Sequence, residues 1–217
     1  MTDLTLIIGN KAYSSWSLRP WLALKHIGRP FAEVVIPLLQ PDSKARILEH
    51  SPAGKVPALK HGDRVIWDSL AICEYLAETF PEAALWPDDA HARAVARSVS
   101  AEMHSGFVAL RTHMPMSLKT MRPGVGRNPD SEADIARVTA IWRETRERFG
   151  TGGPFLFGRF SIADAMYAPV VTRLVTYGVE LDGVCRDYVE TVRTFPPMRE
   201  WTAAAEAEPW VIPVEDL

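Results

Sequence analysis

A run of hydroxyl side chains follows the first apolar segment of the chain. Tyr13, Ser14 and Ser15 come just before apolar residues at helical spacing. The free N–H groups and positive dipole at a helix start favour a negative charge there. This segment contains no cysteine. Its hydroxyls could instead donate a hydrogen bond to a thiolate that belongs to a ligand. The plainer alternative is that Ser14 or Ser15 only caps the helix.

Two further segments have residues that could bind a peptide-like ligand. Val56 precedes Pro57 at a predicted strand start, where the peptide bond could be cis and the Val backbone could pair with an extended peptide. Asp68 and Ser69 begin a helix, where backbone N–H groups and a hydroxyl suit a carboxylate and the Asp suits an ammonium group. An unoccupied edge strand and simple helix capping are the alternatives.

The periodicity of apolar residues predicts the elements that position these segments. Strands are expected at 4–8, 31–38, 56–60 and 64–67, the last two as a hairpin. Helices are expected between the first and second strands, between the second and third, and after the fourth. A helix between two strands implies a parallel pair, and the hairpin adds antiparallel strands. The first part of the chain is therefore expected to be a thioredoxin-like domain with a mixed four-stranded sheet.

From Leu85 onward the pattern is helical. Helices are expected at 88–114, 131–149, 161–177, 184–194 and 197–208. The predicted domains are residues 1–82, thioredoxin-like, and residues 88–217, an all-helical bundle. A set of apolar residues in the first of these helices and just after it could line a pocket or form plain core: Met103, Phe107, Leu110, Met114 and Met116.

The composition excludes several classes of function. The 217 residues carry 24 basic and 27 acidic side chains, a net charge of -3, which disfavours nucleic acid as a partner. Cys73 and Cys185 form no disulfide or zinc motif, and the histidines lack metal-ligand spacing, so no metal is expected. The sequence has neither a signal-peptide pattern nor an apolar run of roughly 20 residues, so we expect a cytoplasmic protein that does not associate with membranes.

Motifs in a fixed order suggest a family. Residues 13–19 (YSSWSLR), 51–59 (SPAGKVPAL) and 68–76 (DSLAICEYL) resemble the N-terminal domain of glutathione S-transferases. Residues 160–165 (FSIADA) resemble the capping box of that family's C-terminal domain. The resemblance spans essentially the whole chain. It implies glutathione as co-substrate, a small hydrophobic electrophile as second substrate, and a homodimer.

The resemblance also implies roles for individual residues. Ser14 would donate to the glutathione thiolate, with Ser15 as its neighbour or substitute and Tyr13 as a rival donor. Val56 would pair with the cysteinyl backbone of glutathione, and Asp68 and Ser69 would hold its γ-glutamyl end. The glycyl carboxylate would meet a basic or amide side chain. The full set implied to bind the peptide frame is Lys55, Val56, Pro57, Asp68 and Ser69, with Gln40 and Lys44 as alternatives to Lys55.

Within the family, the Ser-Ser pair and the following Ser-x-Arg look most like the zeta branch, which includes maleylacetoacetate isomerases. That branch carries Cys at the position of Trp16 and an arginine at the position of Thr176, whereas here Arg173 lies one turn earlier. The leading hypothesis is a cytosolic glutathione transferase. The alternatives are a zeta-like isomerase or dehalogenase, and a non-catalytic module that binds glutathione or a partner.

Overall fold

A mixed four-stranded sheet forms the first half of the protein. The computed structural model describes residues 3–213. The strand order is β2-β1-β3-β4, with β2 parallel to β1 and the other pairs antiparallel, as predicted. Two strands are shorter than expected because Pro37 and Pro57 lie just outside them and cannot donate to a ladder. The strands are β1 (Leu4–Ile8), β2 (Ala32–Val35), β3 (Ala58–His61) and β4 (Arg64–Trp67).

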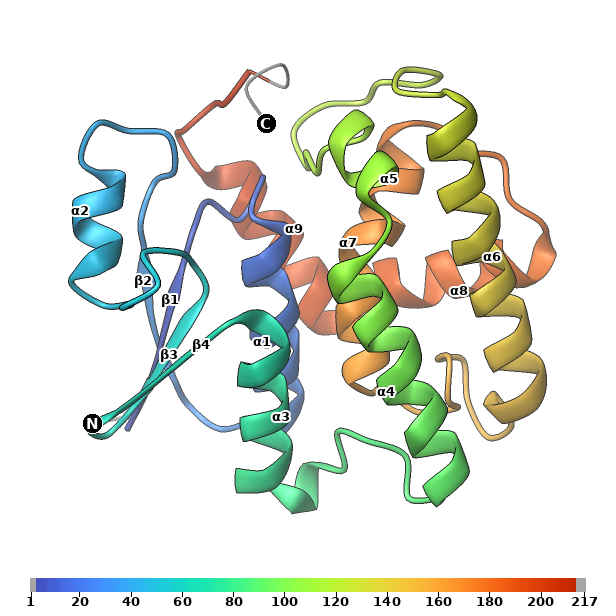
Figure 1. Ribbon diagram of the computed structural model, residues 1–217, viewed down its shortest axis with the longest axis horizontal. Helices are drawn as coiled ribbons and strands as arrows, with labels where there is room; N and C mark the ends of the chain where they lie inside the picture. The colour runs from blue at the N-terminus through green and yellow to red at the C-terminus, as the bar shows by residue number, and fades with distance from the viewer. Residues whose placement is uncertain (1–2, 214–217) are drawn as a thin grey trace.

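Helices cover both faces of the sheet (Figure 1). The helix after β1 ends where predicted, at Gly28, whose positive φ of 74° lets its N–H donate to the carbonyls of Leu24 and Lys25. This helix packs against the third helix and carries the Ser-Ser segment at its start. The helices are α1 (Ser15–Ile27), α2 (Ser43–Leu48) and α3 (Ser69–Thr79), followed by a 3-10 turn, η1 (Pro81–Ala83).

The second half of the protein is helical throughout, which confirms the predicted fold class. Its elements are α4 (Ala90–Ser105), α5 (Val108–His113), α6 (Pro129–Phe149), α7 (Ile162–Thr176), α8 (Gly183–Thr194) and α9 (Pro196–Ala207). The change from sheet to helices falls between η1 and α4. The division into residues 1–82 and 88–217 stays a prediction.

The prediction of one continuous helix over 88–114 is wrong. The chain leaves the helix at Gly106, and Phe107 takes a left-handed conformation with φ 53°. The N–H of Leu110, in the first turn of α5, then donates to Asp134 of α6. That carboxylate comes from a distant part of the chain, so local periodicity could not indicate it. The break lets α5 bring Arg111 to the space between the domains.

The largest apolar core cluster contains residues of both halves and joins them. Helix α1 packs on α3 within its own domain and on α7 and α9 of the helical domain. The set from Met103 to Met116 that could have lined a pocket is buried in this core, each member 7% exposed or less. No helix among residues 3–213 is long and apolar enough to cross a membrane.

The predicted capping box is present at the start of α7. One oxygen of the Asp164 carboxylate accepts from the Ser161 N–H and hydroxyl, and the other accepts from the Leu156 N–H and the Tyr188 hydroxyl. Burial raises the pKa of Asp164 to about 6, so the carboxylate is ionised at neutral pH. One side chain therefore fixes a helix start, a loop and α8.

We expect Asp164→Ala to lower the free energy of unfolding by about 3 to 5 kcal/mol, because several buried donors lose their acceptor together. Asp89 is the matched control, since it caps α4 through one bond, to the Ala92 N–H, from an exposed position. Asp89→Ala should lower it by only about 1 kcal/mol. Urea unfolding at neutral pH measures both, and equal losses would contradict the assigned role of Asp164.

Candidate functional site

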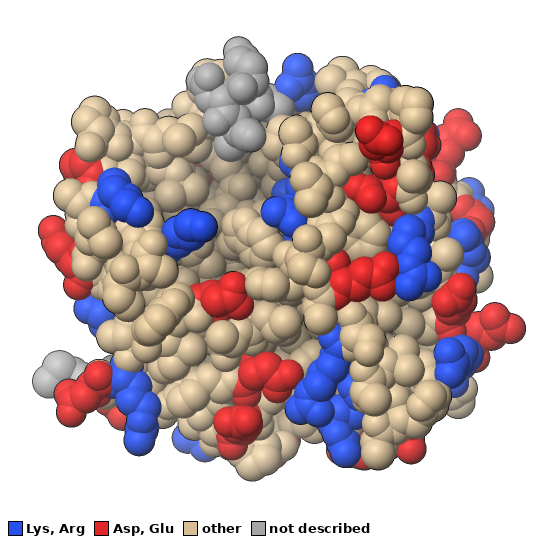
Figure 2. Space-filling model, viewed as in Figure 1, with Lys and Arg blue, Asp and Glu red and all other residues tan. Residues whose placement is uncertain are grey.

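A cavity of about 560 Å³ lies between the two domains, where α1, α3 and the chain before β3 meet α4 and α5. The face in Figure 2 is hollowed between the domains, and basic side chains stand on both sides of the hollow. The cavity wall contains every residue predicted to bind the peptide frame of a ligand. The full lining is Trp16, Ala53, Lys55, Val56, Pro57, Trp67, Asp68, Ser69, His104 and Arg111.

The loop before β3 supplies one side of the cavity. The Val56–Pro57 peptide bond is cis, and Lys55 beside it is exposed. Lys44, an alternative to Lys55, does not line the cavity: its ammonium donates to the carbonyl of Gly54, 3.0 Å away. Gln40, the other alternative, is likewise outside the lining. Of these three side chains, the structure therefore favours Lys55.

The start of α3 supplies the opposite side. Asp68 Oδ1 accepts from the N–H groups of Leu70 and Ala71 at 2.9 and 3.2 Å, so the capping interpretation is confirmed for Asp68. Its other oxygen lies 3.1 Å from Nε2 of His104 on α4. Ser69 Oγ, in a residue only 1% exposed, has no hydrogen-bond partner within the described part of the chain. The cavity wall thus contains the carboxylate of Asp68, which has protein partners, and the hydroxyl of Ser69, which has none within the described residues.

Ser14 and Ser15 lie at the start of α1 and are 5% and 8% exposed. Ser14 occupies the N-cap position of α1, as the capping interpretation expects, but its side chain makes no cap bond. Its Oγ lies 2.7 Å from Oγ of Ser17 instead. Ser15 Oγ accepts from Arg173 Nη2 on α7 over a longer distance, 3.4 Å. Neither serine belongs to the cavity lining, but the next residue, Trp16, does.

The ring of Tyr13 lies in a small apolar cluster away from the lining residues. It packs with Ala12, with Ala205 of α9 and with Ile212 of the C-terminal segment. Tyr13, like Ser14 and Ser15, is not among the lining residues, so the identity of the hydroxyl donor stays a prediction.

Three arginines surround Trp16 and Ser15. The guanidinium carbons of Arg19 and Arg111 lie 4.1 and 5.1 Å from the Trp16 ring centre, and Arg173 contacts Ser15. None of the three forms an ion pair with a carboxylate of residues 3–213. They therefore place uncompensated positive charge beside the start of α1.

The buried members of this cluster have lowered pKa values. Burial, and after it the charges of Arg173 and Arg111, lower the pKa of Arg19 to about 9. Burial followed by Arg111 lowers the pKa of Arg173 to about 10. Both groups stay charged at neutral pH. Nε and Nη1 of Arg19 have no partner among the described residues, so this cation is poorly satisfied.

Sequence reasoning missed several lining residues, among them the two that could carry charge, His104 and Arg111. The spacing of the histidines argues against a metal site and indicates no other role for His104. The arginine lies in the segment predicted as continuous helix, so the bend that brings it inward was not foreseen. An edge contact of 5.3 Å between the rings of His104 and Trp16 ties α4 to α1. No local signal in either segment would have found this contact.

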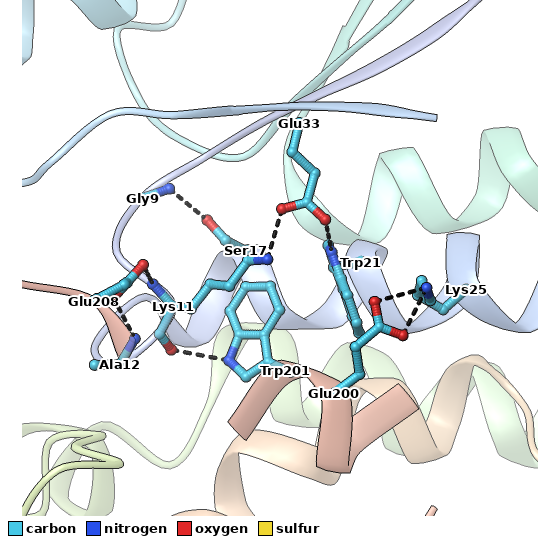
Figure 3. A network of polar contacts seen from close by, with 10 residues as sticks. All are labelled: Gly9, Lys11, Ala12, Ser17, Trp21, Lys25, Glu33, Glu200, Trp201 and Glu208. Atoms are coloured by element: carbon cyan, nitrogen blue, oxygen red, sulfur yellow. Dashed lines mark hydrogen bonds and ion pairs between the residues drawn. The ribbon is translucent and has the colours of Figure 1, made fainter. Parts of the chain in front are cut away.

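The C-terminal helix holds the loop that leads to Ser14 (Figure 3). The Glu208 carboxylate accepts from the backbone N–H groups of Lys11 and Ala12 at 2.7 and 3.2 Å. Trp201 Nε1 donates to the Lys11 carbonyl at 2.9 Å. The Lys11 side chain forms an ion pair with Glu33 of β2, 2.6 Å long. The loop is therefore fixed from the sheet and from α9 at once.

A larger cavity, of about 880 Å³, lies among α7, α8, α9 and residues 118–121. It contains none of the residues predicted to do chemistry, so the smaller cavity is the candidate site. No group of histidine, cysteine, aspartate or glutamate side chains in residues 3–213 could hold a metal ion.

Comparison with known proteins identifies the family. Two family models match: the N-terminal domain of glutathione S-transferase over residues 13–79 and its C-terminal domain over residues 128–204. A protein of Caenorhabditis elegans named "Probable maleylacetoacetate isomerase" is 42% identical over 71% of this chain and 73% of its own length. The maleylacetoacetate isomerase of Rattus norvegicus is 32% identical over 77% of this chain and 76% of its own length. The chain belongs to the glutathione S-transferase family.

The fold of this family member is also seen in solved structures. A glutathione transferase homolog from Burkholderia GL BGR1, crystallised with bound glutathione, matches with a TM-score of 0.73 and 24% identity over 94% of this chain and 99% of its own. The family and fold class predicted from the sequence are confirmed. The roles of individual site residues stay predictions.

We expect Glu208→Ala to speed amide hydrogen exchange at Lys11 and Ala12, because their N–H groups lose the carboxylate that accepts them. Exchange at strand residues such as Leu6 should be unchanged, since β1 keeps its ladder. Hydrogen exchange followed by NMR gives the rates residue by residue. Equally faster exchange in the loop and in β1 would show that the whole protein is destabilised. It would contradict the inference that Glu208 stabilises this loop alone.

Proposed function

We propose that this protein binds glutathione in the cavity between its two domains and activates its thiol with Ser14. Membership of the family identifies the class of enzyme, a glutathione transferase. One observation carries the proposal: Lys55, Val56, Pro57, Asp68 and Ser69, chosen from sequence alone, line a single cavity next to the start of α1. The solved family member with bound glutathione supports the choice of ligand.

The wall of the cavity matches the groups of glutathione. The unused Ser69 hydroxyl and the first N–H groups of α3 suit the γ-glutamyl carboxylate. The second carboxylate oxygen of Asp68 suits the γ-glutamyl ammonium group. That oxygen would then contact both the ammonium group and His104. The half-buried Val56 can pair through its backbone with the cysteinyl residue. Lys55, exposed at the rim, suits the glycyl carboxylate.

In this arrangement the sulfur lies at the start of α1. The thiol proton is lost to solvent, and the Ser14 hydroxyl donates a hydrogen bond to the resulting thiolate. The helix dipole and the guanidinium of Arg173 further favour the negative charge. The thiolate then attacks an electrophilic carbon, forms a carbon–sulfur bond, and displaces a leaving group together with its bonding electrons.

The arginines favour a zeta-type isomerase as the second candidate function. Arg19, Arg111 and Arg173 suit an electrophile that carries a carboxylate better than the purely hydrophobic one that the resemblance implies. Two relatives are named for maleylacetoacetate isomerisation. There the thiolate would add to a carbon–carbon double bond while an electron pair moves onto the conjugated carbonyl oxygen. Rotation about the new single bond and expulsion of the thiolate would complete the isomerisation.

Two further properties are carried over from the family as proposals. We expect a homodimer, which light scattering would show as twice the chain mass. We also expect a cytoplasmic location.

Calorimetric titration with glutathione, together with the thiolate absorbance of the complex as a function of pH, tests the leading function. The wild type should bind glutathione and lower its thiol pKa. Ser69→Ala should weaken binding by about 1 to 3 kcal/mol, the value of a charged hydrogen bond. Ser14→Ala should leave affinity nearly unchanged and lower turnover, because the lost bond is to the thiolate.

The outcomes of this titration separate the hypotheses. Binding with an unshifted thiol pKa would identify the non-catalytic module. Absence of binding would refute the proposed function altogether. Unchanged turnover in Ser14→Ala would move the catalytic role to Ser15 or Tyr13.

Arg111→Met tests the preference for an anionic electrophile, since methionine keeps an unbranched side chain, although a shorter one, and removes the charge. We expect KM for an unsaturated carboxylic acid to rise about tenfold, and KM for its neutral methyl ester to stay the same. Arg137→Met, on the exposed face of α6, is the control and should change neither. An equal change for acid and ester would argue against recognition of charge.

A further inference from the structure

The hydroxyl of Ser17 lies directly against that of Ser14 and has no role in the site predicted from the sequence. Ser17 belongs to the first turn of α1 and is wholly buried. Its Oγ accepts from the backbone N–H of Gly9 at 3.1 Å, a contact drawn in Figure 3. The same oxygen lies 2.7 Å from Ser14 Oγ, so three polar groups form a short chain that begins at the end of β1.

The direction of the first hydrogen bond in this series, from Gly9 to Ser17, is fixed. A backbone N–H only donates, so Ser17 Oγ must accept from Gly9. Gly9 is held close to Leu38: a Cβ added at Gly9 would lie 2.8 Å from a side-chain carbon of Leu38. The absence of a side chain therefore permits the close approach of β1 to the chain after β2. The first donor is positioned by the sheet itself.

The second bond has one favourable direction. The Ser17 hydroxyl carries one hydrogen, and across the described residues Ser14 Oγ is the only acceptor found within its reach. If Ser14 donated instead, a hydrogen of a wholly buried group would be left unpaired, which is unfavourable. Either hydroxyl can donate in this pair, and donation from Ser17 to Ser14 is the direction that satisfies the hydrogen of the more deeply buried residue. The hydrogen of Ser14 is then free to point elsewhere.

We propose that Ser17 is a positioning residue that directs the Ser14 proton at the sulfur of glutathione. The order is Gly9 N–H to Ser17, Ser17 hydroxyl to Ser14, and Ser14 hydroxyl to the thiolate. Each bond polarises the next, so the last hydroxyl becomes a stronger donor to a negative sulfur. This inference rests on the proposed role of Ser14. Ser15 differs, because its oxygen faces the guanidinium of Arg173 and no buried hydroxyl.

The test compares the thiol pKa of bound glutathione, kcat and KM among Ser17→Ala, Ser14→Ala and the double variant. Ser17→Ala should raise the thiol pKa by about one unit. It should lower kcat at a pH below that pKa by about tenfold and leave KM for glutathione unchanged. The double variant should be no worse than Ser14→Ala, because Ser17 acts only through Ser14.

Ser131→Ala is the matched control. Ser131 is also a wholly buried serine near a helix start, and its hydroxyl accepts from the Asn128 N–H and donates to the Gly126 carbonyl. It lies on α6, outside the lining of the cavity. Its replacement should lower stability as Ser17→Ala does without moving the thiol pKa. A pKa shift in Ser17→Ala alone would support the positioning role.

Other results would overturn the inference. An unchanged thiol pKa and kcat in Ser17→Ala would show that Ser17 has only a packing role. The same would follow if the reductions in kcat of the two single variants were additive in the double variant. If the wild type itself does not lower the thiol pKa, the proposed function fails and the inference fails with it. Should Ser17→Ala not fold, Ser17→Cys keeps the volume but donates weakly, and must raise the thiol pKa for the inference to stand.

Discussion

The burial of the first turn of α1 between the two domains is the constraint on which the site depends. The sheet positions this turn through Gly9 and Ser17, and α7 meets it through Arg173 and Ser15. Helix α9 fixes the preceding loop through Glu208. Because the helix start is screened from water, its dipole and the nearby charges act in a low dielectric, where they influence an ionisable ligand strongly.

That burial has an energetic consequence for the arginines. A buried cation is unfavourable unless other groups satisfy it. Arg173 donates to the carbonyls of Met114 and Pro169, whereas Nε and Nη1 of Arg19 have no partner within residues 3–213. A thiolate or a carboxylate in the cavity would supply the missing negative charge. The same cluster that costs stability in the free protein therefore favours an anionic ligand, which is a common compromise at functional sites.

Sequence reasoning predicted the fold and residues of the cavity wall that the first domain supplies, and the reason lies in the range of the contacts. Strand and helix signals are local, and Val56, Asp68 and Ser69 belong to short motifs whose residue types match their chemistry. The bend at Gly106 depends on Asp134, which is distant in sequence. Arg111 follows that bend, and His104, on α4 before it, is held by Asp68 of the α3 start and by Trp16 of α1. Contacts between residues far apart in sequence therefore determine which of these polar residues line the cavity.

Trp16 shows how one substitution can change the rest of a site. Where the zeta branch has a cysteine, this chain has a ring whose faces suit guanidinium groups, with Arg19 and Arg111 beside it. At the position of that branch's arginine, the Thr176 hydroxyl instead donates to the Ser117 carbonyl, and the residue is buried. Positive charge beside the start of α1 therefore comes from Arg19 of α1, Arg111 of α5 and Arg173, which lies about one turn before Thr176 on α7. If isomerase chemistry is retained, these arginines must hold the substrate.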